Sequence, residues 1–257
     1  MTLAITRNVS PRLADCELTC IDAQPIDLER AWAQHAAYVS ALADLGCEVI
    51  ELPAEPELPD SVFVEDAAVV LPEVAVITRP GADSRKPETV SIARALAPHR
   101  PLVHIEAPAS LDGGDVLVMG KAIFVGLSTR SDLRAIEQLK ALLRPFDYIV
   151  TGVPLRGCLH LKSAVTRVDE GTVLINGDWV DATYFDAFER ITVDAAEPHA
   201  ANCLPVNGRI VFPEAFPNTR EKLERHGCAV VTVALDELAK AEGAVTCCSL
   251  VFERDTL

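Results

Sequence analysis

The chain has 257 residues, 49% of them hydrophobic and 24% charged, which is ordinary for a globular protein able to bury a substantial core. With 38 acidic and 23 basic side chains its formal charge is −15, which argues against nucleic acid or an anionic membrane as partner and mildly favours a cationic substrate. No apolar run reaches the roughly 18 residues of a membrane span, and the start, "MTLAITRNVS", lacks a signal-peptide pattern. We therefore expect one domain over residues 1–257 and a cytoplasmic location in which the eight cysteines stay reduced.

The predicted elements repeat along the chain. One unit is "AAVVLPEVAVITRP", two apolar runs across a Pro-containing turn, followed by the helix-like "PETVSIARALAP" and the strand "PLVHIEAP". The next is a hairpin turning at Gly120, then "SDLRAIEQLKALLRPF" and the strand "YIVTGVPL". In that helix Ser131 is the expected N-cap, and apolar residues recur three and four positions apart. These are Leu133, Ile136, Leu139, Leu142 and Leu143.

Two further units follow. The third is a hairpin around Glu170 and Gly171, with "VDATYFDAFER" in the helix position and "ITVDAA" as the last strand. The fourth turns at Asn207 and Gly208, a favoured two-residue hairpin signal, and its helix stops at Gly227. A fifth unit is complete only if the ends of the chain join. "CCSLVFERDTL" then pairs with "MTLAITR", and "LERAWAQHAAYVSALADLGCEVIELP" supplies a helix, a glycine stop and a strand.

Five strand–strand–helix–strand units closed at a terminal seam predict a five-bladed α/β propeller. Closure of this kind also limits exposed sheet edges. The alternative is an open, doubly wound sheet, which explains the alternation of strands and helices but not the recurrent hairpins.

A polar residue stands just before each hairpin, at intervals of 42 to 49 residues: Asp66, Asp115, His160, Asn202 and Cys247. Equivalent positions of a rotational repeat converge on its axis. The pattern therefore predicts a central pocket that combines acids, an imidazole and a thiol.

Each of these residues also has a purely structural interpretation. Glu65 and Asp66 interrupt the apolar "PDSVFVEDAAVV" and are either solvated at an edge or a carboxylate pair for a cation. Asp112 in "LDGGD" is either a turn residue or a group that orients His160. His160 itself lies between two leucines and could be a packed core histidine. The pair in "TCCS" could likewise be small core residues.

Taken together, several motifs resemble those of the dimethylarginine dimethylaminohydrolase family, within the guanidino-group-modifying superfamily. The resemblance runs nearly end to end, and the family's fold is a five-bladed α/β propeller. Arginine deiminases share the chemistry but typically carry a helical insertion for which this chain has no room. The motifs are "PDSVFVEDAAVV", "ITRPGADSRKPE", "LDGGDVLVMG", "FVGLSTRSD", "LHLKS", "AANCLPVN", "FPNTREKLERHG" and "TCCSLVF".

The resemblance implies hydrolysis of Nω-methylated arginine to citrulline and methylamine or dimethylamine through a covalent thiouronium intermediate. Cys247 matches the nucleophile, and Cys248 matches a variable neighbour. His160 matches the group that protonates the leaving amine and then activates water, and Asp112 the group that orients it. Strand alternation also predicts that only one of the two adjacent cysteines faces the pocket.

The resemblance also implies how the substrate is held. Glu65 and Asp66 match guanidinium-binding carboxylates. Arg85 and Arg130 match the groups that bind the substrate carboxylate, a task that suits the planar guanidinium fork. Asp60 and the backbone oxygen of Leu18 match the groups that bind the α-ammonium of the substrate, and the backbone of Ala241 matches the lining of the same end. Leu18 lies in "ADCELTCIDAQP", which we expect to act as a lid.

Neither a cofactor nor a metal is implied, because a thiolate, an imidazole and two acids suffice; captured zinc would inhibit. Two alternatives stay open: a hydrolase acting on unmethylated arginine or another guanidino compound, and a non-catalytic propeller that binds a cationic ligand or partner. The sequence also leaves a homodimer open.

Overall fold

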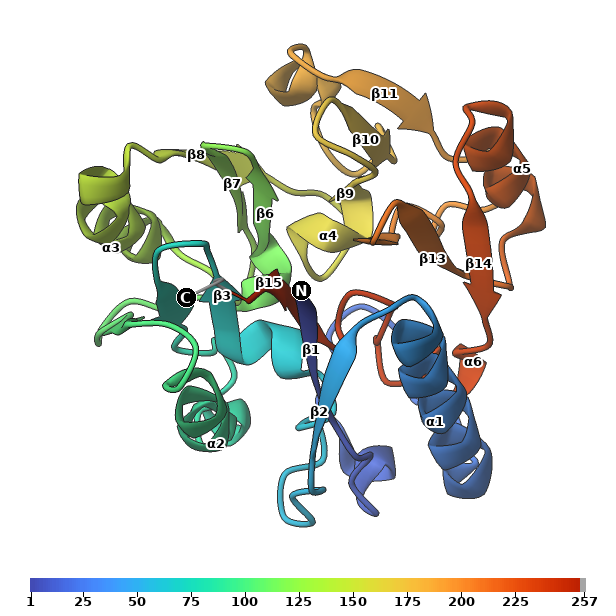
Figure 1. Ribbon diagram of the computed structural model, residues 1–257, viewed down its shortest axis with the longest axis horizontal. Helices are drawn as coiled ribbons and strands as arrows, with labels where there is room; N and C mark the ends of the chain where they lie inside the picture. Colours follow the sequence, from blue (N-terminus) through green and yellow to red (C-terminus); the bar gives the residue numbers. More distant parts are fainter. Residues whose placement is uncertain (255–257) are drawn as a thin grey trace.

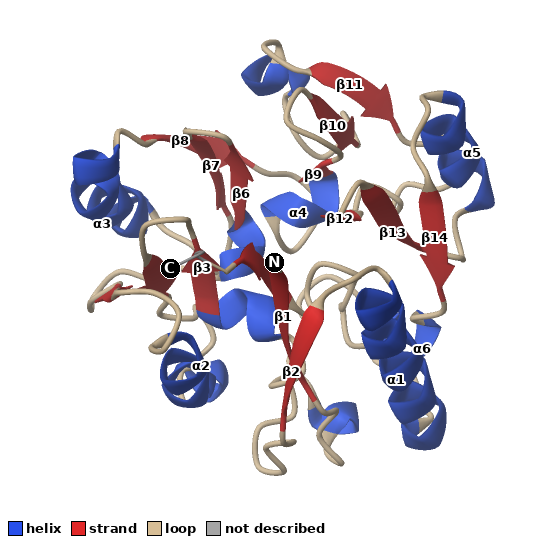
Figure 2. Ribbon diagram, in the orientation of Figure 1, coloured by secondary structure: helices blue, strands red, loops and turns tan. Residues whose placement is uncertain are grey.

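The computed structural model describes residues 1–254, in which fifteen strands form five three-stranded sheets. The sheets are arranged around a common centre, with α1, α2, α3 and α5 at the periphery and α4 near the middle (Figures 1 and 2). The strands, given sheet by sheet from the inside outwards, are β3 (Ala68–Val70), β4 (Ala75–Ile77), β5 (Leu102–His104); β6 (Val116–Met119), β7 (Ala122–Leu127), β8 (Ile149–Pro154); β9 (Val165–Arg167), β10 (Thr172–Ile175), β11 (Glu189–Thr192); β12 (Leu204–Val206), β13 (Arg209–Pro213), β14 (Val230–Val233); and β15 (Leu250–Glu253), β1 (Thr2–Arg7), β2 (Glu48–Leu52). The helices are α1 (Leu28–Asp44), α2 (Glu88–Leu96), α3 (Leu133–Leu143), α4 (Leu161–Ala164), α5 (Pro217–Arg225) and α6 (Asp236–Ala239). The 3₁₀ helices are η1 (Leu13–Asp15), η2 (Val64–Ala67), η3 (Asp83–Arg85), η4 (Gly113–Asp115), η5 (Arg144–Phe146) and η6 (Ala182–Phe185).

All five sheets have the same internal order. The inner strand pairs antiparallel with the middle strand, and the middle strand pairs parallel with the outer one. The fifth sheet joins the two ends of the chain, because β15 pairs antiparallel with β1 in a register that sets Ile5 opposite Leu250. The predicted closed propeller is confirmed, and the open doubly wound sheet is wrong. Residues 255–257, the end of the predicted terminal strand, lie outside the described part.

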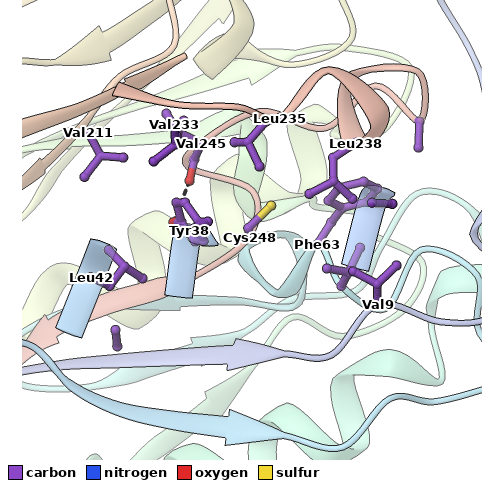
Figure 3. Close-up of a cluster of buried hydrophobic side chains, with 14 of the residues drawn as sticks. Val9, Tyr38, Leu42, Phe63, Val211, Val233, Leu235, Leu238, Val245 and Cys248 are labelled. Atoms are coloured by element: carbon purple, nitrogen blue, oxygen red, sulfur yellow. Dashed lines mark hydrogen bonds between the residues drawn. The ribbon is translucent and has the colours of Figure 1, made fainter. Parts of the chain in front are cut away.

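The core follows the same closed order. Within residues 1–254 the buried apolar side chains form five clusters, and each cluster draws on two neighbouring sheets. The cluster across the terminal seam, for example, joins Leu3 of β1 to Ile77 of β4. Another joins Tyr38 of α1 to Val211 of β13 (Figure 3). Because burial of apolar surface is the main favourable term in folding, each sheet is held by both of its neighbours, and the ring is closed energetically as well as by hydrogen bonds.

Three local expectations need correction. The N-cap of α3 is Asp132, whose carboxylate accepts the amide of Ala135 at 2.9 Å, and not Ser131. The Ser131 hydroxyl instead donates to buried Asp115. Leu133, expected on the core face of α3, is 64% exposed, because the buried face of the helix runs through Ala135 and Ile136 instead. The third unit has only the 3₁₀ helix η6 in its helix position.

The propeller places the ends of three short helices beside one another. η2, η4 and α4 come directly before the inner strands β3, β6 and β9. Asp66 lies in η2, Asp115 ends η4, and His160 is the N-cap of α4. The inner strands themselves line a channel of about 930 Å³. Among the helices of the described residues, none combines the length and apolar character needed to cross a membrane.

Candidate active site

A small cavity of about 20 Å³ lies where these segments meet. Seven of the residues singled out from the sequence contribute to its wall: Asp60, Asp66, Arg85, Arg130, His160, Ala241 and Cys247. Glu17, Phe63, Leu159 and Glu242 complete the lining. Asp112, Glu65 and Leu18 do not line the cavity. The structure thus brings a thiol, an imidazole, carboxylates and guanidinium groups together from segments far apart in the chain.

His160 is surrounded by carboxylates. Its Nε2 lies 3.0 Å from Oδ2 of Asp112, and its Nδ1 lies 3.9 Å from Oδ1 of Asp66. Burial alone would lower the pKa of the imidazole, but Asp66, Asp112 and Asp115 outweigh it and raise that pKa to about 9. The ring therefore carries a proton at neutral pH, as a general acid must before it protonates a leaving group.

Asp112 is fully buried beneath the imidazole. Its Oδ1 accepts the amide of Gly81 at 2.8 Å, and its own amide donates to Oγ of Ser131 at 3.0 Å. Nη1 of Arg130 lies 3.9 Å from Oδ2. These contacts fix the carboxylate against His160, so Asp112 can orient the ring without touching a substrate.

Asp66 is held as an anion by Arg85. Nη1 of Arg85 donates to one oxygen at 2.5 Å and the amide of Gly114 to the other at 2.9 Å. Burial would raise the pKa of Asp66, but His160 and Arg85 outweigh it and lower that pKa to about 2. Asp66 is thus a permanent negative charge on the cavity wall, suited to a cationic ligand.

Arg85 is more deeply engaged than the sequence suggested. Besides Asp66, its Nε and Nη2 donate to both oxygens of Glu88 at 3.1 and 2.9 Å, and Nη2 also faces the carbonyl of Phe63 at 3.2 Å. Arginine has five N–H groups, so one hydrogen on Nη1 is left for a ligand in the cavity. Burial, partly offset by Arg85, raises the pKa of Glu88 to about 7. Arg85 therefore contributes to the fold as well as lining the site.

The glycines of "LDGGD" are required by close packing. A Cβ atom on Gly114 would lie 2.6 Å from Nδ1 of His160 and 2.8 Å from Oδ1 of Asp66. On Gly113 it would lie 1.9 Å from the carbonyl oxygen of Glu65. The motif looked like a weak turn signal in the sequence, but it lets η4 approach the site more closely than any side chain would permit.

Cys247 lies in a turn over residues 245–248 that precedes β15, so the expected strand alternation is not what separates the two cysteines. Cys247 lines the cavity, whereas Cys248 is fully buried in the apolar cluster with Tyr38 and Leu235 (Figure 3). Burial, followed by the charges of Glu65 and Asp66, raises the pKa of the Cys247 thiol to about 12. The thiol is therefore neutral when no cation is nearby.

Glu65 points towards the central channel and not into the small cavity. Its two oxygens accept from Nζ of Lys162 at 2.6 Å and from Oγ1 of Thr246 at 2.7 Å. Asn202 in turn holds Thr246, because its Nδ2 donates to Oγ1 of Thr246 and its Oδ1 accepts the Thr246 amide. The Glu65 amide donates to the carbonyl of Cys247 at 3.2 Å, so the residue supports the turn that carries the thiol. Sequence reasoning missed Lys162 and Thr246; their nearness in sequence to His160 and Cys247 was the available signal.

The segment expected to form a lid lies across the opposite end of the cavity. The amide of Glu17 donates to Asp60 at 3.2 Å, and Nη2 of Arg130 donates to the hydroxyl of Thr19 at 2.9 Å. Leu18, between them, is half-buried. Glu242 accepts the amides of Thr19 and Cys20 at 2.8 and 2.6 Å, two contacts that the sequence did not suggest. These four hydrogen bonds hold the segment against this end of the cavity.

Two polar groups at this end are poised for a ligand. Nη1 of Arg130 is buried and has no hydrogen-bond partner among residues 1–254. A buried donor without a partner is unfavourable, so this nitrogen favours an incoming acceptor such as a carboxylate. Burial raises the pKa of Asp60, although Arg85 and the Glu17 amide counteract it.

Asp66, Asp112 and His160 each offer a ligand atom within 4.8 Å of the others, the spacing of a metal site. Their acceptor atoms are already used, however: Arg85 and Gly114 occupy Asp66, and Asp112 faces a protonated imidazole. The cluster is suited to holding a proton, and we assign no metal to it.

The chain matches the family model described as eukaryotic N,N-dimethylarginine dimethylhydrolase over residues 21–182. It is 40% identical over 248 residues to the dimethylarginine dimethylaminohydrolase of Streptomyces coelicolor, covering 96% of this chain and 95% of the relative. With the corresponding protein of Pseudomonas aeruginosa it is 36% identical over 228 residues, covering 88% and 90%. The chain belongs to the dimethylarginine dimethylaminohydrolase family.

Solved structures agree with this assignment. A cysteine-to-serine variant of the Pseudomonas aeruginosa enzyme in complex with citrulline superimposes with a TM-score of 0.93 at 35% identity, over 97% of this chain and 98% of that one. A histidine-to-glycine variant of a dimethylarginine dimethylaminohydrolase, as an adduct with S-methyl-L-thiocitrulline, gives 0.93 at 34% identity, over 98% and 100%. The N-terminal domain of an arginine dihydrolase from cyanobacteria shares the fold, with a TM-score of 0.87 at 20% identity over 98% of both chains.

Proposed function

We propose that the protein hydrolyses Nω-methylated arginine, either asymmetric dimethylarginine or monomethylarginine, to citrulline and dimethylamine or methylamine. The observation that carries the proposal is the convergence of Cys247, protonated His160 and anionic Asp66 on one cavity, in a chain of this family. The relatives named above are dimethylarginine dimethylaminohydrolases, and one is bound to citrulline.

Substrate binding begins with charge. The guanidinium cation lies against Asp66, and the substrate carboxylate takes the free Nη1 of Arg130 together with the remaining Nη1 hydrogen of Arg85. The α-ammonium lies beside Asp60 and the backbone of Ala241, which line the cavity. We also place it beside the backbone oxygen of Leu18, the match that the family resemblance gives for the same end. A cation beside the Cys247 sulfur stabilises the thiolate, which lowers the pKa of the thiol from its high resting value. The substrate therefore helps to create the nucleophile that attacks it.

In the first half-reaction the thiolate of Cys247 attacks the central guanidinium carbon and forms a C–S bond. As the C–N bond to the methylated nitrogen breaks, His160 gives that nitrogen its proton, and the neutral amine leaves. Asp112 holds the ring in place during the transfer. A thiouronium adduct on Cys247 and a neutral imidazole remain.

In the second half-reaction the neutral His160 removes a proton from water. The resulting hydroxide adds to the thiouronium carbon, and the C–S bond breaks to give the Cys247 thiolate and citrulline protonated on its new oxygen. The thiolate takes up that proton, which leaves neutral citrulline and the resting thiol. The proton that the thiol gave to solvent when the substrate bound is balanced by protonation of the released amine. His160 is protonated again, and the cycle is complete. No further proton donor, metal or cofactor is needed for this balance.

The closed segment over residues 16–20 has to open for this cycle. A cavity of about 20 Å³ accommodates about one water molecule and not an amino acid. Apart from Cys16, which packs against an apolar cluster, the segment is held mainly by hydrogen bonds of Asp60, Arg130 and Glu242, so its opening exposes little apolar surface. We therefore propose that it acts as a lid.

The test is incubation of the reduced protein with asymmetric dimethylarginine, monomethylarginine and arginine, with citrulline and the released amine as readouts. We expect citrulline from the methylated substrates and none from a Cys247→Ser control. Turnover of arginine alone would instead support a deiminase-like hydrolase. Complete inactivity of the folded protein would support a cation-binding propeller. We propose that the chain acts as one domain in the cytoplasm; light scattering after size-exclusion chromatography decides whether it forms a homodimer.

A further inference from the structure

Asp115 is a fully buried carboxylate that does not line the cavity. It ends η4 and accepts three hydrogen bonds. Oδ2 accepts from the hydroxyls of Ser128 and Ser131, both at 2.6 Å, and Oδ1 accepts from the amide of Leu161 at 3.0 Å. The three donors come from the loop after β7 and from the start of α4. A single carboxylate thus ties together segments of two neighbouring sheets.

Each of these donors leads directly to a residue of the site. Leu161 follows His160, which is the N-cap of α4. The Ser131 hydroxyl accepts the amide of Asp112 at 3.0 Å. The Ser128 hydroxyl accepts the amide of Arg130 at 3.0 Å. The backbone at His160, Asp112 and Arg130 is therefore linked to Asp115 through one or two hydrogen bonds.

We propose that Asp115 is a positioning residue that sets His160, Asp112 and Arg130 in mutual register through its three hydrogen bonds, for the reaction proposed above. The inference rests on the proposed function only for its kinetic readouts. Asp115 occupies in the second sheet the repeat position that Asp66, His160 and Cys247 occupy in the first, third and fifth. Asp66, His160 and Cys247 line the cavity and take part in the proposed reaction. Asp115 instead holds the segments that carry site residues.

The chemistry requires a carboxylate at this position and not an amide. Both serine hydroxyls already accept backbone amides: Ser131 that of Asp112, and Ser128 those of Arg130 and Ser131. Each hydroxyl must therefore donate a hydrogen bond, and an anionic oxygen can accept both hydrogen bonds. An asparagine could accept from Leu161 through its oxygen, but its NH₂ group would face two hydroxyl protons with no lone pair to offer them.

The space around Asp115 is as restricted as its hydrogen bonding. A Cβ atom on Gly126 would lie 2.4 Å from Oδ1 of Asp115 and 3.0 Å from Cβ of Leu161. The glycine therefore allows β7 to pass close enough for the carboxylate to reach α4. A longer glutamate at position 115 would not fit without moving the strand.

The charge of Asp115 also acts on His160. Other charged or titratable groups on the segments around the imidazole are Asp66, Asp112, Arg85, Arg130 and Cys247. Burial raises the pKa of Asp115 to about 6, despite His160 and both serine hydroxyls, so the carboxylate is ionised above neutral pH. Replacing it by a neutral amide removes one of the three anions that hold a proton on His160.

The test is Asp115→Asn, with Glu197→Gln as matched control. Glu197 is also a buried acid that accepts two backbone amides, those of Asn218 and Thr219 at 2.9 and 2.7 Å, but it lies at the start of α5 and not at the site. For Asp115→Asn we expect kcat for methylarginine to fall by about 10- to 100-fold, the scale of a small misplacement of reacting groups. The control should lose thermal stability but keep its kcat.

A second readout needs no substrate. Titration of the His160 imidazole by NMR should give a lower pKa in Asp115→Asn than in the wild type and an unchanged pKa in Glu197→Gln. This readout separates failure of the positioning role from failure of the proposed reaction. A folded Asp115→Asn variant with both its kcat and its imidazole titration unchanged would overturn the inference.

If Asp115→Asn does not fold, Ser131→Ala answers the same question with a smaller change. It removes one link between Asp115 and Asp112. We expect it to fold and to lose several-fold in kcat with little change in KM, because the link orients His160 and does not bind substrate. An unchanged kcat in the folded Ser131→Ala variant would contradict the inference.

Discussion

The pKa values of His160 and Cys247 are both raised in the cavity, but the two shifts have opposite consequences. Around His160 three carboxylates outweigh burial and raise the pKa to about 9, which keeps the ring charged. Around Cys247 burial and two carboxylates raise the pKa to about 12, which keeps the thiol neutral. The same negative field thus prepares the acid and restrains the nucleophile. The proton donor is ready before substrate arrives, and the nucleophile is not.

The largest expected effect tests which cysteine belongs to this comparison. Cys247→Ser should lower turnover of dimethylarginine by more than about 10³-fold, because the attacking sulfur is lost. Cys248→Ser should keep most of the turnover and lose some stability, since Cys248 is buried among apolar side chains. Citrulline assays and thermal unfolding measure both quantities. The opposite pattern would reverse the assignment of the nucleophile.

A second contrast separates the two arginines of the cavity. Arg85→Ala should destabilise the fold by about 3–5 kcal/mol, because it leaves the carboxylates of Asp66 and Glu88 buried without their partner. Arg130→Ala should mainly raise KM for dimethylarginine, since its buried Nη1 has no hydrogen-bond partner in the described structure. Denaturant unfolding and steady-state kinetics together test this. Equal losses of stability in the two variants would show that the contrast is wrong.

The smallest expected effect is a dependence of stability on pH. The pKa of His160 is 6.5 ordinarily and about 9 in the fold, so the folded protein binds the extra proton between these values. Its contribution to the free energy of unfolding is complete below pH 6.5 and is lost as pH rises through 9. The free energy of unfolding of the wild type, relative to that of His160→Asn, should therefore fall as pH rises from 6.5 to 9. A difference independent of pH would mean that the imidazole is not held protonated.

Much of the fold could be predicted, because each repeat is marked by short local patterns such as hairpin turns and apolar strand and helix segments. Asn207 and Gly208 mark a hairpin, and both have positive φ values, as that turn requires. The pairing of the two chain ends followed from counting units, since four complete units left one strand at each end without a partner. Ser131 was misassigned because a helix cap and a buried site contact require the same residue type, and only the three-dimensional neighbourhood distinguishes them.

The site could be predicted in part. The repeat positions brought Asp66, His160 and Cys247 together, and the family resemblance supplied roles for the rest. Of the site's ion pairs within residues 1–254, only that of Arg85 with Glu88 is local, three residues apart. The pairs of Arg85 with Asp66 and of Glu65 with Lys162 join residues 19 and 97 positions apart, so the sequence could not predict them. A list of motifs shows which residues meet, but not how the charges among them are shared.

The most direct test of the central claim locates the covalent intermediate. His160→Gly, which lacks the group proposed to activate water, is incubated with S-methyl-L-thiocitrulline, digested and mapped by mass spectrometry. We predict an adduct on the peptide of "VTCCSLVF", with fragmentation placing it on Cys247. An adduct on Cys248, or none on a folded and reduced sample, would contradict the account.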